Sequence, residues 1–373
     1  MHFEKLERLI DTMPQRGIPA CDLKVTLDGE TVFRRMAGYS DVAGTRPVSE
    51  NDLYWIFSAT KPITCTAGMR LIEDGKLSLD DPVSKYLPEF AHLTVKTADG
   101  IVPCQTPMTV RHLFTMHGGM NYDLQHPILM KARENRNATT RELVAAMARE
   151  PLDFEPGAHW QYSLCHDVLA AVIEVASDMT FGEYLKKVMF DPLGMENTGF
   201  FPTEEQKKRF SAQYDYCVGS GKAIPVETGC AFQLSDRYES GGAGLFSSTD
   251  DYCKVMTALA CDGVSPEGYR LLKSETIAQM EVNHLDPART GFPERRMYGY
   301  GFGLCGRVHI DPAYSLSPSS IGEFGWDGAA AAFAMVDRPK RIGMYFATHI
   351  FNCEPLYIVL HAEMRRLFIE GLE

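Results

Sequence analysis

The stretch Tyr54-Trp55-Ile56-Phe57-Ser58-Ala59-Thr60-Lys61-Pro62 decides how the rest of the chain is interpreted. It starts with a short apolar run typical of the end of a buried segment, and apolar residues then recur at helical spacing to about Gly75. Ser58 is therefore predicted where a helix begins, and Lys61 lies one turn further on over the same face. Pro62 fits the first turn, because that turn has no N–H group to lose.

A serine and a lysine at this spacing favour nucleophilic catalysis. The start of a helix offers unpaired N–H groups and the positive end of the dipole, which stabilise negative charge. A desolvated lysine near this end has a lowered pKa, and its neutral amine can take the proton of the Ser58 hydroxyl. The alternative is that Ser58 only caps the helix. Ser-x-x-Lys occurs at this one place in the chain, and Gly-x-Ser-x-Gly does not occur.

The composition indicates a globular protein with an acidic balance. The 373 residues are 45% hydrophobic, enough to bury a large core in one large domain or two interleaved ones. The formal charge of −12 argues against nucleic acid or an anionic membrane as the main partner, because both bind basic surfaces. The first ten residues alternate charged and apolar side chains, so neither an export signal nor a membrane anchor is predicted. A cytoplasmic location is expected.

The cysteines and histidines predict neither disulfides nor a metal site. Ten cysteines are scattered along the chain without a Cys-x-x-Cys pair, and without an export signal they are predicted to be reduced thiols. His112 and His117 are five residues apart, a spacing that does not stack on a helix. No metal ion or other cofactor is predicted.

Strands are predicted at both ends of the chain and helices between them. The predicted strands are residues 22–27, 31–36, 299–304, 330–336 and 342–347. Turns are predicted at Asp28-Gly29 and at Asp337-Arg338-Pro339-Lys340. The predicted helices are residues 3–13, 58–75, 108–115, 140–149, 167–176, 181–189 and 354–369. Few strands are expected between residues 90 and 223.

This order predicts an α/β (α+β) fold. One antiparallel sheet is built from both termini and flanked by helices, and a mainly helical domain is inserted into it. The expected domains are 1–88 with 224–373, which contain the sheet, and 89–223, which is mainly helical. The active site is expected where the two meet.

A third catalytic group is predicted at Tyr162, in Trp160-Gln161-Tyr162-Ser163, just before a helix. Placed between Lys61 and the substrate, its hydroxyl can relay the Ser58 proton or protonate the leaving group. The alternative is a packing tyrosine with a satisfied hydroxyl.

The segment Phe324-Gly325-Trp326-Asp327-Gly328-Ala329 leads into a predicted strand. Its glycines let a substrate backbone approach, so Trp326, Asp327 and Gly328 are expected to contact the substrate. The N–H groups of Ala329 and Ser58 are expected to form an oxyanion hole. The alternative is that these glycines only form a bulge or turn.

Taken together and in order, these segments resemble the β-lactamase-related serine hydrolases. That family includes class C β-lactamases, penicillin-binding DD-peptidases, and a set of esterases and acyltransferases. The resemblance extends over residues 56–62, 77–83, 86–90, 109–113, 162–163, 192–195 and 241–245. It implies that Ser58 is the acylated nucleophile, that Lys61 is its base or proton relay, and that Tyr162 is the second acid/base. It also implies a β-lactamase/transpeptidase-like fold, with residues 325–329 as the oxyanion strand.

Two departures from the family pattern indicate ester chemistry. Tyr-x-Asn is replaced by Tyr162-Ser163-Leu164, which removes the amide that grips a peptide-like acyl group. Lys-Thr-Gly is replaced by Trp326-Asp327-Gly328, which removes the groups that receive a β-lactam or D-Ala carboxylate. Asp327 would repel such a carboxylate if it faces the cleft, but strand alternation also allows it to face away. Both changes resemble the carboxylesterase branch.

The expected function is therefore hydrolysis of a small-molecule ester through an acyl-enzyme on Ser58. The alternatives are a β-lactamase, a D-amino-acid peptidase or an amidase, which would cleave an amide, and an acyltransferase that uses the same intermediate. A non-catalytic binding protein of this fold is a further alternative. Arg289, Arg295 and Arg296 either line the mouth of the site or belong to a solvated loop.

Overall fold

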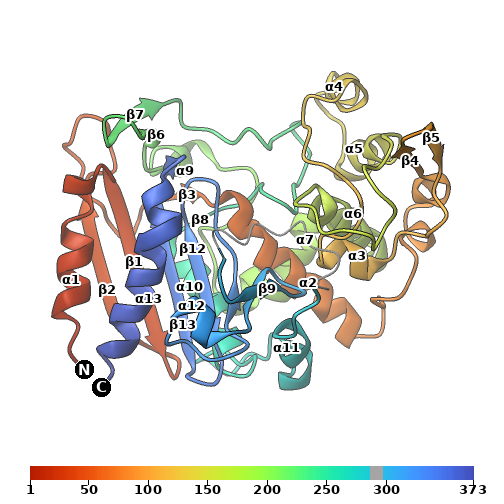
Figure 1. Cartoon of the computed structure of the whole chain (residues 1–373). Helices are drawn as coiled ribbons and strands as arrows, with labels where there is room; N and C mark the ends of the chain where they lie inside the picture. Colours follow the sequence, from red (N-terminus) through yellow and green to blue (C-terminus); the bar gives the residue numbers. More distant parts are fainter. Residues whose placement is uncertain (286–296) are drawn as a thin grey trace.

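A seven-stranded antiparallel sheet forms the centre of the computed structural model, which describes residues 1–285 and 297–373 (Figure 1). The strand order is β2-β1-β13-β12-β11-β10-β9. The strands are β1 (Ala20–Leu27), β2 (Glu30–Gly38), β9 (Tyr300–Phe302), β10 (Arg307–His309), β11 (Phe324–Gly325), β12 (Phe333–Asp337) and β13 (Ile342–Thr348). The first two strands of the chain therefore join five strands from its last quarter, which confirms the predicted sheet.

The predicted hairpin joins β1 to β2 at Asp28 and Gly29, whose φ angles are 51° and 89°. Two left-handed residues in succession match the right-handed twist of the flanking strands. β1 pairs on its other side with β13, from Cys21 opposite Thr348 to Leu27 opposite Ile342. Both β12 and β13 are buried along their whole length, because helices cover both faces of the sheet.

The helices α1 (Glu4–Asp11) and α13 (His361–Glu370) lie side by side over one face of the sheet (Figure 1). A π-helical turn, Leu356–Leu360, leads into α13. The two ends of the chain meet there, and the N–H of His2 donates to the carbonyl of Gly371 at 2.7 Å. On the opposite face α10 (Thr249–Ala260) packs against β1, β12 and β13.

The helix α2 (Thr60–Glu73) follows the predicted nucleophile and is largely buried. Its first ten residues are all buried, and it packs against α6 (Cys165–Ser177). The other helices between residues 90 and 210 are α3 (Val110–Phe114), α4 (Pro127–Arg133), α5 (Thr140–Met147), α7 (Phe181–Leu185), α8 (Asp191–Leu193) and α9 (Glu204–Lys207). Helices α11 (Ser274–Met280) and α12 (Pro312–Ser315) are the remaining α-helices in the described ranges.

Several short strands lie outside the main sheet. They are β3 (Tyr54–Trp55) paired with β8 (Phe246–Ser247), β4 (Thr94–Thr97) paired with β5 (Gly100–Pro103), and β6 (Gln213–Cys217) between β7 (Lys222–Val226) and β14 (Ile350–Phe351). Sequence periodicity does not reveal β5, because all four of its residues are exposed and it has no buried face.

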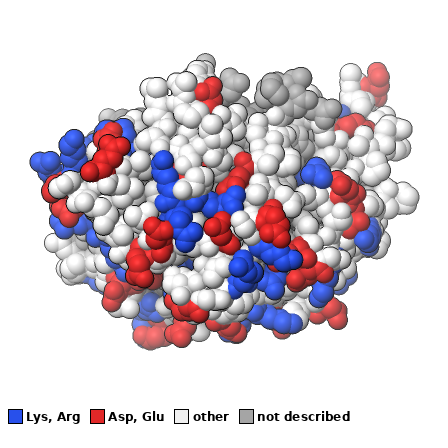
Figure 2. Space-filling model, turned by 90° about the horizontal axis from the view of Figure 1, so that it is seen from below, with Lys and Arg blue, Asp and Glu red and all other residues white. Residues whose placement is uncertain are grey.

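The parallel pairing of β6 with β14 joins Tyr214 to Ile350. Strand β6, from residues 89–223, therefore pairs with a strand from residues 224–373, which also contribute five strands to the main sheet. The division into domains at residues 88 and 223 remains a prediction. None of the helices in residues 1–285 and 297–373 combines the length and apolar character needed to cross a membrane. Figure 2 shows basic and acidic side chains interspersed over the face of the molecule seen from below.

Candidate active site

Ser58 lies in a 3₁₀ turn, Phe57–Ala59, and α2 begins two residues later at Thr60. Phe57 has a φ of 47°, a left-handed conformation that a bulky residue adopts only where its surroundings impose it. The turn is tied to α10 here, because Tyr252 donates its hydroxyl to the Ala59 carbonyl at 2.7 Å. The Ser58 side chain is held at the start of a buried helix, as the sequence predicted.

Lys61 follows one turn later, and its side chain is buried. Its Nζ lies 3.2 Å from Ser58 Oγ, 3.4 Å from Tyr122 Oη and 2.8 Å from the carbonyl oxygen of Gly242. A neutral amine fits this set by donating two hydrogens and accepting the Ser58 proton, and an ammonium fits it by donating three. Lys61 can therefore hold either protonation state without losing a partner.

Tyr162, far from Ser58 in the sequence, donates its hydroxyl to Ser58 Oγ at 2.6 Å. Trp326 Nε1 donates to the same tyrosine oxygen at 3.2 Å. The Tyr162 ring lies under Lys61, with 4.6 Å between Nζ and the ring centroid. The structure thus brings together the three residues that the sequence singled out, and it adds an indole donor to the tyrosine oxygen.

Tyr122 is the residue at this site that sequence reasoning missed. Its ring stacks on Tyr162 at 5.3 Å between centroids and 5° between planes. Burial, with Tyr162 and Asp167 nearby, raises the pKa of Tyr122 well above its ordinary value, so its hydroxyl stays protonated. No spacing pattern relates Tyr122 to Ser58, because the two residues meet only through the path of a loop.

Asp167, at the start of α6, binds the segment that leads to the Gly242 carbonyl used by Lys61. Its Oδ1 accepts from Tyr238 Oη at 2.7 Å and from Ser240 Oγ at 2.5 Å. Gly242 lies directly against the other carboxylate oxygen, and a Cβ there would clash with it. A residue without a side chain is therefore needed at 242 to bring its carbonyl to Lys61.

The turn that carries Ala329 packs against the nucleophile segment. A Cβ on Gly328 would lie 2.5 Å from the Ile56 carbonyl oxygen, so only glycine allows this approach. The Ala329 N–H has no hydrogen-bond acceptor among the residues that the structure describes. From behind, the hydroxyl of Tyr357 lies 2.7 Å from the carbonyl oxygen of Gly328 and 2.8 Å from that of Ala329. The Ala329 N–H is thus free for an oxyanion.

Trp326 and Asp327 point to opposite faces, as neighbours in an extended segment do. Trp326 faces Tyr162, with 5.7 Å between ring centroids. Asp327 turns the other way and accepts from Arg307 Nη1 at 2.6 Å, with His361 Nδ1 at 3.7 Å from its second oxygen. Burial opposes ionisation, yet Arg307 and His361 hold the pKa of Asp327 below its usual value. The expectation that Asp327 contacts substrate is therefore wrong.

The residues after Tyr162 carry no group that grips a substrate amide. Ser163 is buried, and its Oγ contacts Cys165 Sγ at 3.1 Å. Leu164, at the position of the family asparagine, is buried in the core. Arg289, Arg295 and Arg296 lie outside the described residues. In residues 1–285 and 297–373, no three His, Cys, Asp or Glu side chains gather closely enough to hold a metal ion.

Comparisons with known proteins agree with this geometry. The Beta-lactamase family profile matches residues 6–361. The chain is similar to Esterase EstB of Burkholderia gladioli, at 31% identity over 92% of this chain and 90% of that protein. It is also similar to Acyltransferase calJ of Penicillium decumbens, at 30% identity over 88% of this chain and 83% of that protein.

A solved structure shares the fold. It is EstCE1, described as a hydrolase with promiscuous acyltransferase activity, with a TM-score of 0.82 and 24% identity. The superposition covers 98% of this chain and 97% of the EstCE1 chain. The mixture of helices and an antiparallel sheet is therefore of the β-lactamase/transpeptidase type.

Proposed function

Because the chain belongs to the beta-lactamase family, we propose that it is a serine hydrolase that cleaves small carboxylic esters through an acyl-enzyme on Ser58. One observation carries this proposal. Ser58 Oγ accepts a hydrogen bond from Tyr162 at 2.6 Å and lies 3.2 Å from the Lys61 amine. A nucleophile next to both a base and an acid is what acyl transfer requires.

Acylation begins when Ser58 Oγ attacks the ester carbonyl carbon. The neutral Lys61 amine takes the Ser58 proton, and Tyr162 gives its proton to the departing alcohol oxygen. The phenolate that remains on Tyr162 is stabilised by the Trp326 N–H at 3.2 Å and by the Lys61 ammonium close to its ring. The Tyr162 phenolate therefore keeps two partners of favourable sign.

Deacylation reverses these proton movements. Water attacks the acyl carbon and loses a proton to Tyr162, while Ser58 Oγ leaves and recovers its proton from Lys61. The N–H groups of Ser58 and Ala329 stabilise the negative oxygen of both tetrahedral intermediates. The cycle ends with the residues in their starting states and with one carboxylic acid and one alcohol released.

The surroundings of Ser58 suit a neutral, partly apolar ester. Tyr122 and Trp326 lie beside Tyr162, and Phe232 packs edge-on against Tyr122 at 5.8 Å between centroids. Leu164 replaces the amide that a peptide-like substrate would use. The similarity to Esterase EstB supports ester hydrolysis over cleavage of a β-lactam or another amide.

Acyl transfer is the second candidate, and the similarity to Acyltransferase calJ favours it. It uses the same acyl-enzyme, with an alcohol or amine replacing water in the second step. The two activities are separated by adding an alcohol during turnover of a p-nitrophenyl ester. Faster nitrophenol release together with a new ester indicates transfer, and an unchanged rate with only free acid indicates hydrolysis.

We also propose a reducing compartment, the cytoplasm, for this enzyme. All ten cysteines are free thiols, and six of them are buried. Thiols persist in this state where cellular reductants keep disulfides from forming.

Intact-mass analysis tests the nucleophile directly. The wild-type protein should gain the mass of a fluorophosphonate adduct and, transiently, of an acyl group from a p-nitrophenyl ester. Ser58→Ala should show neither adduct and should keep its fold, because a serine at a helix start contributes only about 0.5–2 kcal/mol. Ser163→Ala is the matched control, since Ser163 is buried nearby but contacts Cys165, and it should label normally. Labelling of Ser58→Ala would refute the assignment.

A further inference from the structure

A cavity of about 410 Å³ lies on the face of the sheet that turns away from Ser58. Arg307 from β10 and Arg365 from α13 line it, together with Asp327 and Tyr357. The two arginine side chains are only 4% and 7% exposed. This is a polar cavity with two buried guanidinium groups, and it is separate from the catalytic residues.

Arg365 has fewer partners than a buried guanidinium needs. Its Nη1 donates to Ser317 Oγ at 3.2 Å, and in residues 1–285 and 297–373 its one ion-pair partner is Glu323 at 3.4 Å. Its Nε is buried and has no hydrogen-bond partner among the described residues. Burial lowers the pKa of Arg365 to about 10. This direction is expected for a buried cation whose charge is only partly balanced by nearby anions.

Glu323 cannot neutralise both arginines. Its carboxyl is fully buried, lies 3.8 Å from Arg307 Nη2, and has one oxygen without a hydrogen-bond donor in the described ranges. Burial raises the pKa of Glu323 to about 7, although Arg307 opposes this shift. Arg307 is already paired with Asp327 at 2.6 Å, so Arg365 is left with Glu323 at 3.4 Å and with an Nε that has no hydrogen-bond partner in the described ranges.

Part of the mouth of the cavity is apolar. Leu316, Ile358 and Val359 line it and are 83%, 52% and 56% exposed. Deeper in, the Arg365 guanidinium lies over the Tyr300 ring at 5.2 Å from its centroid. An occupant that satisfies both regions has one anionic group for Arg365 and an apolar body for the mouth.

We propose that this cavity binds small carboxylates that carry an apolar body, with the carboxylate directed at Arg365. Ester hydrolysis releases acids of this class. Only this link between the ligand of the cavity and the product of the reaction rests on the proposed function. The occupant would also touch Tyr357, whose hydroxyl holds the carbonyl groups of Gly328 and Ala329. Binding is therefore expected to change the rate of the reaction at Ser58 without competing with substrate.

Isothermal titration calorimetry with benzoate tests binding, and Ser58→Ala is used as the protein so that turnover plays no part. Benzoate should bind at one site, while neutral benzamide and inorganic phosphate should bind at least about tenfold more weakly. Equal binding of benzamide would overturn the role of charge. Equal or tighter binding of phosphate would overturn the role of the apolar body. Neither result depends on whether Ser58 is a nucleophile.

Two variants test whether benzoate binds in this cavity. Arg365→Met in the same protein should weaken benzoate binding by about tenfold or more, whereas Arg35→Met should not, because Arg35 pairs with Asp11 at the surface and does not line the cavity. Val359→Glu adds a negative charge at an exposed position that folding does not use, and it should also weaken benzoate binding. Unchanged affinity in Val359→Glu would show that benzoate binds elsewhere, even if Arg365→Met fails to fold.

Discussion

Arg307 holds the carboxylate of Asp327 at 2.6 Å on the face of the sheet opposite to Ser58. Arg307 also donates through Nη2 to the carbonyl of Ala334, so it ties the segment before the oxyanion turn to β12. The role of Asp327 is thus to keep a buried cation paired. This changes the prediction for variants at this position.

Asp327→Asn should lower the free energy of unfolding by about 3 kcal/mol, because Arg307 loses its closest anion. The ratio of kcat/KM for an anionic ester to kcat/KM for a matched neutral ester should stay the same, since residue 327 does not face the substrate. Urea unfolding and steady-state kinetics measure the two quantities. A ratio that rises about tenfold would show that Asp327 reaches the active site after all.

Lys61→Ala should reduce turnover nearly as much as Ser58→Ala, because the amine that accepts the Ser58 proton is lost. The double variant should be no slower than the slower single variant, since residues that act as one unit give losses that do not add. Single-turnover rates with a p-nitrophenyl ester compare the three proteins. Losses that multiply in the double variant would mean that Lys61 acts independently of Ser58.

Tyr162→Phe and Tyr122→Phe form a matched pair, because the two rings stack and each variant removes one hydroxyl. Tyr162→Phe should lower kcat by about 10²–10⁴, the contribution of a general acid or base. Tyr122→Phe should have a much smaller effect, because the 2.6 Å bond to Ser58 Oγ is made by Tyr162, whereas the Tyr122 hydroxyl lies 3.4 Å from Lys61. Measured kcat values in the reverse order would transfer the acid/base role to Tyr122.

Tyr357→Phe tests whether the oxyanion turn must be held from behind. Loss of the hydroxyl frees the carbonyl groups of Gly328 and Ala329, so kcat should fall by about tenfold while KM changes little. Tyr345→Phe is the control, because the Tyr345 hydroxyl is buried without a hydrogen-bond partner in the described residues. Affinity for a boronic acid transition-state analogue should fall in Tyr357→Phe and remain in Tyr345→Phe. Equal affinities would leave Tyr357 with a packing role only.

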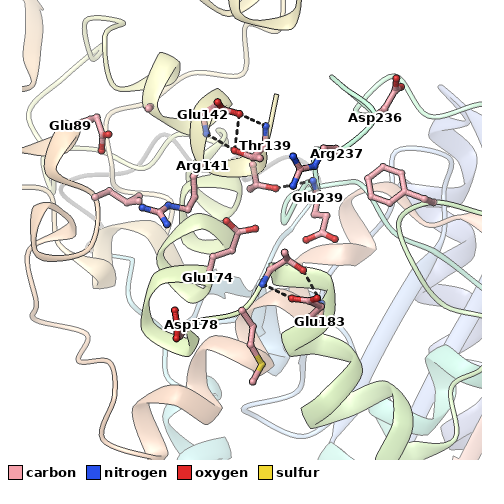
Figure 3. A pocket seen from close by; sticks show the side chains of 16 residues that line it. Glu89, Thr139, Arg141, Glu142, Glu174, Asp178, Glu183, Asp236, Arg237 and Glu239 are labelled. Atoms are coloured by element: carbon pink, nitrogen blue, oxygen red, sulfur yellow. Dashed lines mark hydrogen bonds between the residues drawn. The ribbon is translucent and has the colours of Figure 1, made fainter. Parts of the chain in front are cut away.

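Glu174 makes stability depend on pH. It lines a second cavity, beside Glu239 and Glu183 (Figure 3). Burial, and then the neighbouring Glu239, raise the pKa of Glu174 to about 7. The folded state therefore binds this proton more tightly than the unfolded state, and stability falls as pH rises from about 4.5 to 7.

Glu174→Gln should remove this fall and be more stable than the wild type at pH 8, by at most about 3 kcal/mol. The amide oxygen can still accept from the Phe181 N–H, which Glu174 does at 3.2 Å. Glu183→Gln, an exposed acid in the same cavity, is the control and should lack this gain. Urea unfolding from pH 5 to pH 8 gives the curves. A Glu174→Gln curve that runs parallel to the wild-type curve over this range would contradict the assignment.

The sequence by itself determined the features that depend on short separations along the chain. Two residues with positive φ at Asp28-Gly29 close a hairpin, and a spacing of three on a helix brings Lys61 to Ser58. The segment order predicted the antiparallel sheet, and the motif order predicted the family. These inferences hold because local backbone geometry and helical or strand periodicity restrict them before any tertiary contact forms.

Only the tertiary structure decided which groups meet across long separations. Tyr122 reaches Lys61 by the path of a loop, and β6 pairs with β14 although neither has a distinctive pattern. The orientation of Asp327 is the sharpest case. Alternation put Trp326 and Asp327 on opposite faces, but it did not say which face contained Ser58. Tertiary packing determined the orientation. The Trp326 ring packs against Tyr162, and the Asp327 carboxylate pairs with Arg307, whose buried charge requires an anion.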